Sequence, residues 1–513
     1  MTGGMRASRR VVTCLAALAV ALGAFAACSD DEPEAKPTTT TTTTEATTAS
    51  TTTTTEATTT TPPLTALVWE ECDGGFECAT LDVPIDYEVP EGDQLTVALV
   101  RRVARLPEQR LGTILMNPGG PGASAINFVE SIPLPTELTD RFDIVGFDPR
   151  GVGRSTPLDC HSRLQELYDA DPTIDDDADR ETLLTLSQAF VAECVDAHGD
   201  LLPHLGTVDV ARDMERIRIA MGEPQVNYVG FSYGTAIGQQ YARLFPASVR
   251  TMVLDGVVQP GITGLEGAVG QAQSFTAALD AFIAACDDRG CGLDEPAGQV
   301  IDEVIAASEL APIEATRSRS ATPGVVSLAL AQGLYADELW PQLGRALSQA
   351  SRGNGNGLVE LADAYLQRRP DGTYTNMFEG YFAVSCLDSV WPKDPQMVMD
   401  HAALIGAAYP RLGEALVNDY VRCPMWPTEA EPLPPVPSDI ADLSPVLIIS
   451  TTGDPATPYA AGVAVREQIP GSVLVTNVAN GHTAFAQGVP CIDDTVTRYI
   501  VDGVAPAEDL ICQ

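Results

Sequence analysis

Basic side chains are scarce in this chain of 513 residues. It carries 30 Lys and Arg against 70 Asp and Glu, a formal net charge of −40, and only Lys36 and Lys393 are lysines. A protein that binds nucleic acid neutralises phosphates with basic side chains, so this balance excludes DNA and RNA as partners. The apolar fraction of 45% is ample for a buried core, and the length predicts more than one structural unit.

Metal-ligand and redox motifs are also missing. The chain has five His, scattered along its length, with no HExxH sequence, and no CxxC pair occurs among its Cys. These absences argue against a catalytic metal, a zinc ribbon and thioredoxin-like redox chemistry. We therefore expect no metal and no cofactor.

The first 27 residues have the pattern of a secretory signal peptide. A basic stretch ending at Arg9 and Arg10 precedes an uncharged apolar run, residues 11–27, and Cys28 follows. A small-residue run that ends in Cys resembles the bacterial lipobox, which predicts lipidation of Cys28 and membrane attachment through that lipid. We expect an exported protein, either a lipoprotein on the outer face of the cell membrane or, as the alternative, a secreted one.

Residues 28–65 follow as a Thr-rich linker with almost no large apolar side chain. Such a segment cannot bury enough surface to offset its chain entropy, so it predicts disorder. We interpret it as a stalk, or as a spacer with no role beyond reach.

Twelve Cys in an exported chain indicate disulfide bonds. Cys14 lies in the signal and Cys28 at the lipid site, which leaves ten. Pairing across short loops favours Cys72–Cys78, Cys160–Cys194, Cys286–Cys291, Cys386–Cys423 and Cys491–Cys512.

Short apolar runs that end in Gly-rich or Asp-containing turns recur from about residue 95. They are LTVALV (95–100), GTILMN (112–117), FDIVGF (142–147), VNYVGF (226–231), VRTMVLD (249–255), PVLIIST (445–451) and SVLVTNV (472–478). Runs without polar alternation are typical of strands buried on both faces of a parallel sheet, and helical stretches such as 236–245 lie between them. The pattern predicts a doubly wound α/β domain, whose ligands sit at the carboxyl ends of the strands.

Gly230-Phe-Ser-Tyr-Gly234 lies directly after one such run. This is the GxSxG nucleophile elbow, in which the glycines allow a sharp strand-to-helix turn that exposes the hydroxyl of Ser232. A serine needs a base to take its proton, and the usual base is His. In this fold the acid and the His follow the Ser in the chain, which leaves His401, in a helical stretch, and His482, in the loop after the last strand. We predict His482.

The acid of the triad should follow a strand between the Ser and the His. Asp454, in GDPATP after PVLIIST, fits that position, and Asp255 after VRTMVLD is the alternative. The oxyanion of the reaction needs backbone donors. We assign them to the amide of Tyr233 and to Gly120 in NPGGPG, with Gly119 as the alternative.

Asp148 and Arg150 lie in FDPRGVGRS, and we expect them to form a structural ion pair that shapes a neighbouring loop.

Together, NPGGPG, FDPRGVGRS, GFSYGT, GDPATP and GHT, preceded by WEECDGGFECATLDVPIDY, resemble the secreted actinobacterial α/β-hydrolases of the tripeptidyl aminopeptidase type. The likeness is especially close to the lipoprotein serine hydrolases of the mycobacterial cell envelope and covers the chain from about Trp69 to Cys512. It implies a serine exopeptidase that releases short peptides, often tripeptides, from a free amino terminus of a peptide or protein substrate. It also implies esterase activity on small artificial esters.

The domain organisation expected from these patterns has two hydrolase segments, 66–260 and 441–513. The second resembles the C-terminal part of tripeptidyl aminopeptidases (TAP-like) and carries the proposed acid and His. Between them lies a mainly helical lid, 261–440, which would arch over the nucleophile and restrict access to chain ends. An enzyme that reads a free ammonium group needs carboxylates near the site, and the lid offers Asp337, Glu338, Glu379 and Asp388. We select Asp388 first and Glu379 second.

Two other functions remain open at this stage. The same triad serves a carboxylesterase or lipase that acts on acyl esters. A catalytically dead hydrolase fold could instead be a surface binding module, although such a module has no need of a complete set of catalytic motifs.

Overall fold

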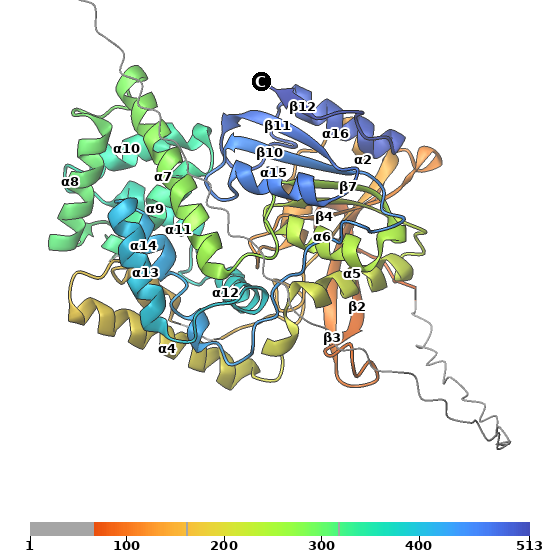
Figure 1. The fold of residues 1–513 in the computed structure, drawn as a ribbon, viewed down its shortest axis with the longest axis horizontal. Coiled ribbons are helices and arrows are strands. Elements are labelled where there is room, and N and C mark those ends of the chain that lie inside the picture. Colours follow the sequence, from red (N-terminus) through yellow and green to blue (C-terminus); the bar gives the residue numbers. More distant parts are fainter. Residues whose placement is uncertain (1–65, 161–162, 317–318) are drawn as a thin grey trace, which may run out of the picture. The chain divides into compact units, whose positions relative to one another are not determined.

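One ten-stranded sheet forms the framework of the two hydrolase segments (Figure 1). The computed structural model describes residues 66–160, 163–316 and 319–513. The predicted signal peptide, the lipid site Cys28 and the linker to residue 65 lie outside the described residues. The strands of the sheet, in spatial order, are β1 (Glu70–Cys72), β2 (Phe76–Pro84), β3 (Gln94–Arg102), β5 (Phe142–Phe147), β4 (Gly112–Asn117), β6 (Val226–Phe231), β7 (Val249–Asp255), β10 (Val446–Gly453), β11 (Val473–Asn480) and β12 (Leu510–Cys512).

The strands from β5 to β12 in this order run parallel, as the apolar runs predict. Every residue of β4, β5 and β6 is buried, which explains why these strands show no polar alternation. The run at 95–100 is the exception, because β3 pairs antiparallel with both β2 and β5. Only a short connection, residues 85–93, joins β2 to β3, and a short connection suits a hairpin and not a parallel crossover.

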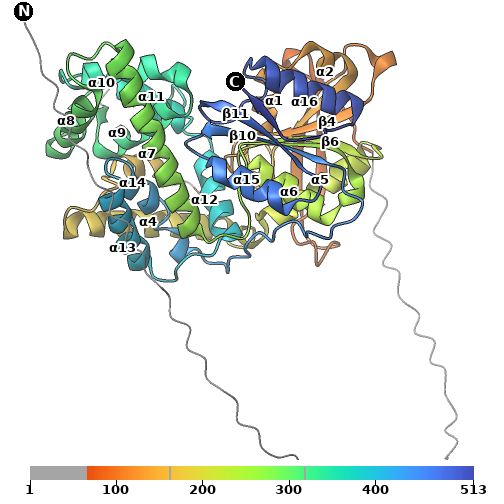
Figure 2. The same ribbon diagram turned by 45° about the horizontal axis from the view of Figure 1, so that its top comes forward.

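Helices cover both faces of the sheet. Figure 2 shows α1 (Ala125–Ser131), α2 (Thr136–Arg141) and α16 (Pro490–Asp502) on one side, and α5 (Thr207–Ala220), α6 (Gly234–Leu244) and α15 (Tyr459–Gln468) on the other. Successive strand residues face opposite layers, so Val253 of β7 belongs to the apolar core under α16 and its neighbour Leu254 to the core under α6. This is the doubly wound architecture that the sequence predicts.

A helical region lies between β7 and β10, where the lid is expected. Its elements are α7 (Gly264–Arg289), α8 (Ala297–Leu310), β8 (Ile313–Glu314), β9 (Ser320–Ala321), α9 (Pro323–Leu334), α10 (Trp340–Ala350), α11 (Asn356–Tyr365), α12 (Met377–Asp388), α13 (Pro395–Ala408) and α14 (Gly413–Asn418). It has an apolar core of its own, which includes Phe282, Leu330 and Leu347. Two helices from the first hydrolase segment pack with it, α3 (Leu164–Asp169) and α4 (Asp177–His198). In α4, Leu183 shares a cluster with Met399 of α13.

All five predicted disulfides are confirmed. They join residues between 5 and 37 positions apart, so proximity along the chain was a sufficient guide to the pairing. The Cys386–Cys423 bridge fixes the last turn of α12 to the segment that follows α14.

The expected ion pair between Asp148 and Arg150 is wrong. The fully buried guanidinium of Arg150 binds Asp213 of α5 through two bonds, Nε to Oδ2 at 2.8 Å and Nη2 to Oδ1 at 2.6 Å. Asp148 accepts hydrogen bonds from Ser124 Oγ at 2.7 Å and from the Arg154 amide at 2.8 Å. The two side chains lie in one turn but contact different helices. Asp148 accepts hydrogen bonds at the start of α1, and Arg150 binds a side chain of α5.

Candidate active site

The nucleophile elbow has the form that its sequence predicts. β6 ends at Phe231, Ser232 adopts a positive φ of 51°, and α6 begins at Gly234. A Cβ on Gly230 would lie 2.4 Å from the Gly234 carbonyl oxygen, and a Cβ on Gly234 would lie 2.5 Å from the Asn117 carbonyl oxygen. Only glycine fits at either position, so the turn can close and hold Ser232 between strand and helix.

Asp454 and His482 come together at the carboxyl ends of β10 and β11. The imidazole Nδ1 of His482 lies 2.9 Å from both carboxylate oxygens of Asp454. Four further donors contact that carboxylate. They are the amides of Ala456 and Thr457 and the hydroxyl of Thr457, each at 2.9 Å, and the amide of Thr483 at 3.5 Å. Because the carboxylate cannot turn, it holds the imidazole in one orientation with Nε2 facing away from Asp454.

The surroundings of His482 raise its pKa above the ordinary value of 6.5. Burial alone would lower the pKa, but the charge and hydrogen bond of Asp454 outweigh that effect, and the charge of Asp255 adds to it. The same interactions stabilise the protonated imidazole, and the raised pKa makes His482 a better proton acceptor.

Asp255, the alternative acid, takes a different place. Its Oδ2 accepts hydrogen bonds from the amides of Ala484 at 2.9 Å and Phe485 at 2.8 Å, both in the loop that carries His482. Burial raises the pKa of Asp255 to about 6, although these two bonds oppose the shift. The carboxylate thus shapes the histidine loop without a hydrogen bond to the imidazole.

The elbow and the histidine loop meet at the end of β7. The amide of Ser232 donates to the Asp255 carbonyl at 2.8 Å, and a Cβ on Gly256 would lie 3.1 Å from Cε1 of His482. The side chains of Ser232 and His482 form no hydrogen bond with each other in this structure. Catalytic hydrogen bonds of this kind are often long until substrate binds.

The two glycines considered for the oxyanion site differ in what their amides contact. The amide of Gly119 donates to Asn117 Oδ1 at 2.8 Å, so it is already occupied. The amides of Gly120 and Tyr233 have no acceptor among the described residues. A Cβ on Gly119 would lie 2.5 Å from the Tyr233 nitrogen, which shows how closely the glycine loop approaches the elbow.

The histidine loop is also held from the helical region, by a residue that no sequence motif marked. The amide of His482 donates to the carbonyl of Tyr335 at 2.8 Å, and Ala336 and Gly481 form an antiparallel bridge. The Tyr335 ring meets the imidazole edge to face, with centroids 5.5 Å apart. Thr457, which lies inside the GDPATP motif but had no predicted role, is a second such residue, because its hydroxyl contacts both Asp454 and His482.

The two carboxylates predicted to bind a substrate ammonium group are buried in α12. Asp388 accepts hydrogen bonds from the Tyr233 hydroxyl and, at 3.2 Å, from the Thr207 amide. Burial raises the pKa of Asp388 to about 6. Glu379 is buried nine residues earlier in the same helix. The other two carboxylates considered, Asp337 and Glu338, lie in a short helical turn before α10.

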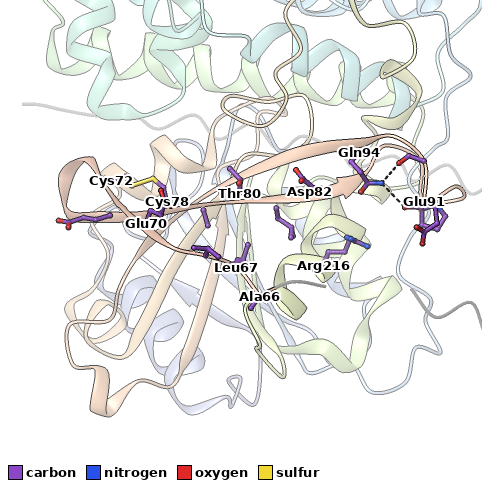
Figure 3. A pocket seen from close by; sticks show the side chains of 16 residues that line it. Ala66, Leu67, Glu70, Cys72, Cys78, Thr80, Asp82, Glu91, Gln94 and Arg216 are labelled. Atoms are coloured by element: carbon purple, nitrogen blue, oxygen red, sulfur yellow. Dashed lines mark hydrogen bonds between the residues drawn. A yellow bond between two sulfur atoms is a disulfide. The ribbon is translucent and has the colours of Figure 1, made fainter. Parts of the chain in front are cut away.

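A broad groove of about 860 Å³ lies away from these residues (Figure 3). It is lined by β1, β2 and the start of β3, with Arg216 of α5 at one side. Its lining includes none of the predicted site residues.

Within the described ranges, no group of three or more His, Cys, Asp or Glu side chains is arranged to hold a metal ion. Over the same residues, every helix is too short or too polar to cross a membrane.

Comparison with known proteins agrees with this arrangement. The model of the TAP-like protein family matches residues 409–512, and the model of the alpha/beta hydrolase fold matches residues 112–297. The serine protease Hip1 of Mycobacterium tuberculosis is 36% identical over 466 residues, 86% of this chain and 88% of the relative. Carboxylesterase B of the same organism is 36% identical over 456 residues, 85% and 86% of the two chains.

The tripeptidyl aminopeptidase of Streptomyces lividans is 30% identical over 486 residues, 86% of each chain. The chain belongs to the TAP-like family of α/β-hydrolases and is a serine hydrolase.

Proposed function

We propose that this protein is an exported exopeptidase that releases short peptides, tripeptides among them, from the amino terminus of a peptide or protein substrate. The observation that carries the proposal is the bond between Asp454 and His482 beside the Ser232 elbow. The likeness to a tripeptidyl aminopeptidase and to a serine protease supports a peptide substrate.

In the first step, the Ser232 hydroxyl attacks the carbonyl carbon of the scissile bond and passes its proton to Nε2 of His482. The amides of Gly120 and Tyr233 donate to the oxygen that becomes negative, and Asp454 stabilises the imidazolium. The carbon–nitrogen bond then breaks, His482 gives the proton to the departing amine, and the amino-terminal peptide remains as an ester on Ser232.

In the second step, a water molecule gives a proton to His482 and attacks the ester carbonyl. The carbon–oxygen bond to Ser232 breaks, the serine regains its proton from His482, and the short peptide leaves as a carboxylic acid. Both steps use the same donors and the same base, so no metal or cofactor enters.

A carboxylesterase is the second candidate function, because carboxylesterase B is as similar in sequence as the serine protease. The chemistry on Ser232 is the same, and only the group that leaves in the first step differs. Mass spectrometry of peptides with free or acetylated amino termini separates the two. Tripeptide release from free termini supports the exopeptidase, whereas hydrolysis of short acyl esters without peptide cleavage supports the esterase.

Ser232→Ala is the control for both activities and should also abolish covalent labelling by a fluorophosphonate. Ser131→Ala, at an exposed position of α1, is the matched variant and should keep labelling and turnover. Labelling that persists in Ser232→Ala would place the nucleophile elsewhere.

We further propose that residues 1–27 are a signal peptide and that a lipid on Cys28 anchors the protein to the membrane. The five disulfides support export, because such bonds persist in oxidising compartments. Cys28→Ala should release the protein from the membrane fraction and prevent incorporation of labelled fatty acid.

A further inference from the structure

Helix α12 contacts both loops that carry the proposed oxyanion donors. At the start of the helix, a Cβ on Gly122 would lie 2.1 Å from the Met377 carbonyl oxygen. Only glycine fits there, so the helix packs directly on the loop that contains Gly120. At the end of the helix, Asp388 accepts a hydrogen bond from the hydroxyl of Tyr233. The two ends of one helix therefore meet the two sides of the oxyanion site.

Both ends of α12 are fixed to other parts of the chain. The side chain of Asn376, directly before the helix, makes three hydrogen bonds of 2.9 to 3.0 Å with residues 151–158. The Cys386–Cys423 disulfide holds the last turn. Because neither end can shift alone, the helix gives a side chain at its end a fixed position.

Asp388, Tyr233 and Thr207 form a closed set of hydrogen bonds. Thr207 Oγ1 donates to the Tyr233 hydroxyl at 3.3 Å, and that hydroxyl donates to Asp388 Oδ2. The Thr207 amide donates to both oxygens of Asp388 at 3.2 Å. Thr207 is the first residue of α5, and Gly206 before it has no side chain to cap that helix. The buried Asp388 carboxylate therefore caps α5 and restrains the Tyr233 ring at the same time.

The charge on Asp388 depends on pH. Burial raises the pKa of Asp388 to about 6, although its hydrogen bonds from Tyr233 and Thr207 oppose the shift. The charge of Asp209, in the first turn of α5, raises this pKa further, and Asp209 is paired with Arg212. At neutral pH the carboxylate is charged, so the bond from the Tyr233 hydroxyl is charge-assisted. That charge is lost as the pH falls through about 6.

We propose that Asp388 is a positioning residue of the oxyanion site, whose carboxylate holds the Tyr233 ring so that the Tyr233 amide stays directed at the oxygen that becomes negative. This inference rests on the proposed roles of Ser232 and Tyr233. It differs from the ammonium-binding role expected from the sequence, because both oxygens of Asp388 already accept hydrogen bonds from this chain.

The main chain of Tyr233 shows why a restraint on its ring matters. The Tyr233 carbonyl accepts from the Ala236 amide at 3.0 Å, whereas its own amide has no acceptor among the described residues. An oxyanion donor is effective when its direction is set before the charge develops. With the carbonyl fixed by α6 and the ring fixed by Asp388, the amide has little freedom to turn away.

The test measures kcat and KM for the Ser232-dependent hydrolysis of p-nitrophenyl acetate. Tyr233→Phe removes only the ring hydroxyl and leaves Asp388 on the α5 amide. It should lower kcat about 10-fold, less than the roughly 10²- to 10³-fold cost of a missing oxyanion donor, because the amide remains. KM should stay close to the wild-type value. Asp388→Asn should give a similar loss, and the double variant should be no slower than the slower single variant, since both changes weaken one bond.

Tyr241→Phe is the matched control. Tyr241 of α6 donates to Glu215 Oε2 of α5 at 2.7 Å, so it too is a tyrosine bonded to a carboxylate, but it lies about two turns beyond the elbow. This variant should keep the wild-type kcat, and urea unfolding shows whether each variant is folded. A loss of kcat equal to that of Tyr233→Phe would assign the effect to helix packing and overturn the proposal.

Two further readouts separate positioning from a structural role. Phenylboronic acid forms a tetrahedral adduct with a nucleophilic serine, so its inhibition constant should rise in Tyr233→Phe and Asp388→Asn by the factor by which kcat falls. Protonated Asp388 resembles asparagine in its charge. The ratio of wild-type to Asp388→Asn activity should therefore fall towards unity as the pH falls through about 6.

Three outcomes would contradict these assignments at different levels. Wild-type kcat in Tyr233→Phe and Asp388→Asn would leave Asp388 as a cap of α5 alone and overturn the proposal, as would an activity ratio that does not change with pH. Hydrolysis that persists in Ser232→Ala would overturn the nucleophile, and the oxyanion site with it. Cleavage of esters but of no peptide would overturn the exopeptidase function and leave the role of Asp388 in place.

Discussion

Tyr335 of the helical region holds His482 of the hydrolase segment by a backbone hydrogen bond of 2.8 Å and by an edge-to-face ring contact. The main chain around His482 is thus fixed from two directions, by Tyr335 and, through the amides of Ala484 and Phe485, by Asp255. The helical region between β7 and β10 therefore supports the main chain and the ring of the proposed base.

Replacing Tyr335 by Ala should reduce kcat on ester and peptide substrates alike by roughly two- to tenfold. An aromatic pair contributes about 0.5–1.5 kcal/mol beyond its buried area, and its loss lets the imidazole turn. Tyr335→Phe keeps the ring and should stay close to the wild type. Steady-state kinetics of the two variants check this, and a loss confined to peptides would assign Tyr335 to substrate binding instead.

Asp454→Asn should lower kcat by about 10⁴, because the asparagine favours the wrong tautomer of His482 and cannot stabilise the imidazolium. Asp255→Asn is the matched variant and should cost far less, since its carboxylate contacts the loop amides and not the imidazole. Turnover of a small ester by both variants is the measurement. A large loss in Asp255→Asn with little change in Asp454→Asn would transfer the role of the acid.

The pH dependence of kcat/KM should show an acid limb with its midpoint above pH 6.5. The neutral imidazole is the base, and the pKa of His482 is raised, so the active form accumulates only as the pH climbs through that higher value. Asp454→Asn removes the largest cause that raises the pKa and should move the midpoint to lower pH. Residual ester hydrolysis measured from pH 4 to 9 tests this, and an unshifted limb would show that another group controls it.

Arg150→Met should destabilise the fold by about 3–5 kcal/mol, because it leaves the buried carboxylate of Asp213 without a positively charged partner, with only the Tyr87 hydroxyl to donate to it. Arg180→Met, which breaks an exposed pair with Asp177, should change the free energy of unfolding by less than about 1 kcal/mol. Urea unfolding of both variants makes the comparison. Equal effects would mean that the Arg150 pair contributes no more than a surface pair.

The local sequence was enough to predict the parallel strands from β4 to β11, the elbow and the disulfides. A strand buried on both faces needs an uninterrupted apolar run, a sharp turn before a helix needs glycines around the serine, and cysteines close in the chain can pair without long-range folding. The order of Ser232, Asp454 and His482 followed from the same local signals, each at the end of a strand. The strands and the elbow depend on residues within a few positions of one another, and the disulfides on cysteines no more than 37 positions apart.

Only the tertiary structure decided the rest. The sequence offered two carboxylates for His482, and the packing of β7 beside β10 places Asp454 on the imidazole and Asp255 on the loop amides. The sequence predicted Asp148 as the partner of Arg150, whereas the packing of α5 places Asp213 beside the guanidinium. Tyr335 belongs to no motif, because its contact with His482 depends on how segments distant in the chain pack together. Contacts of that kind leave no local pattern in a single sequence.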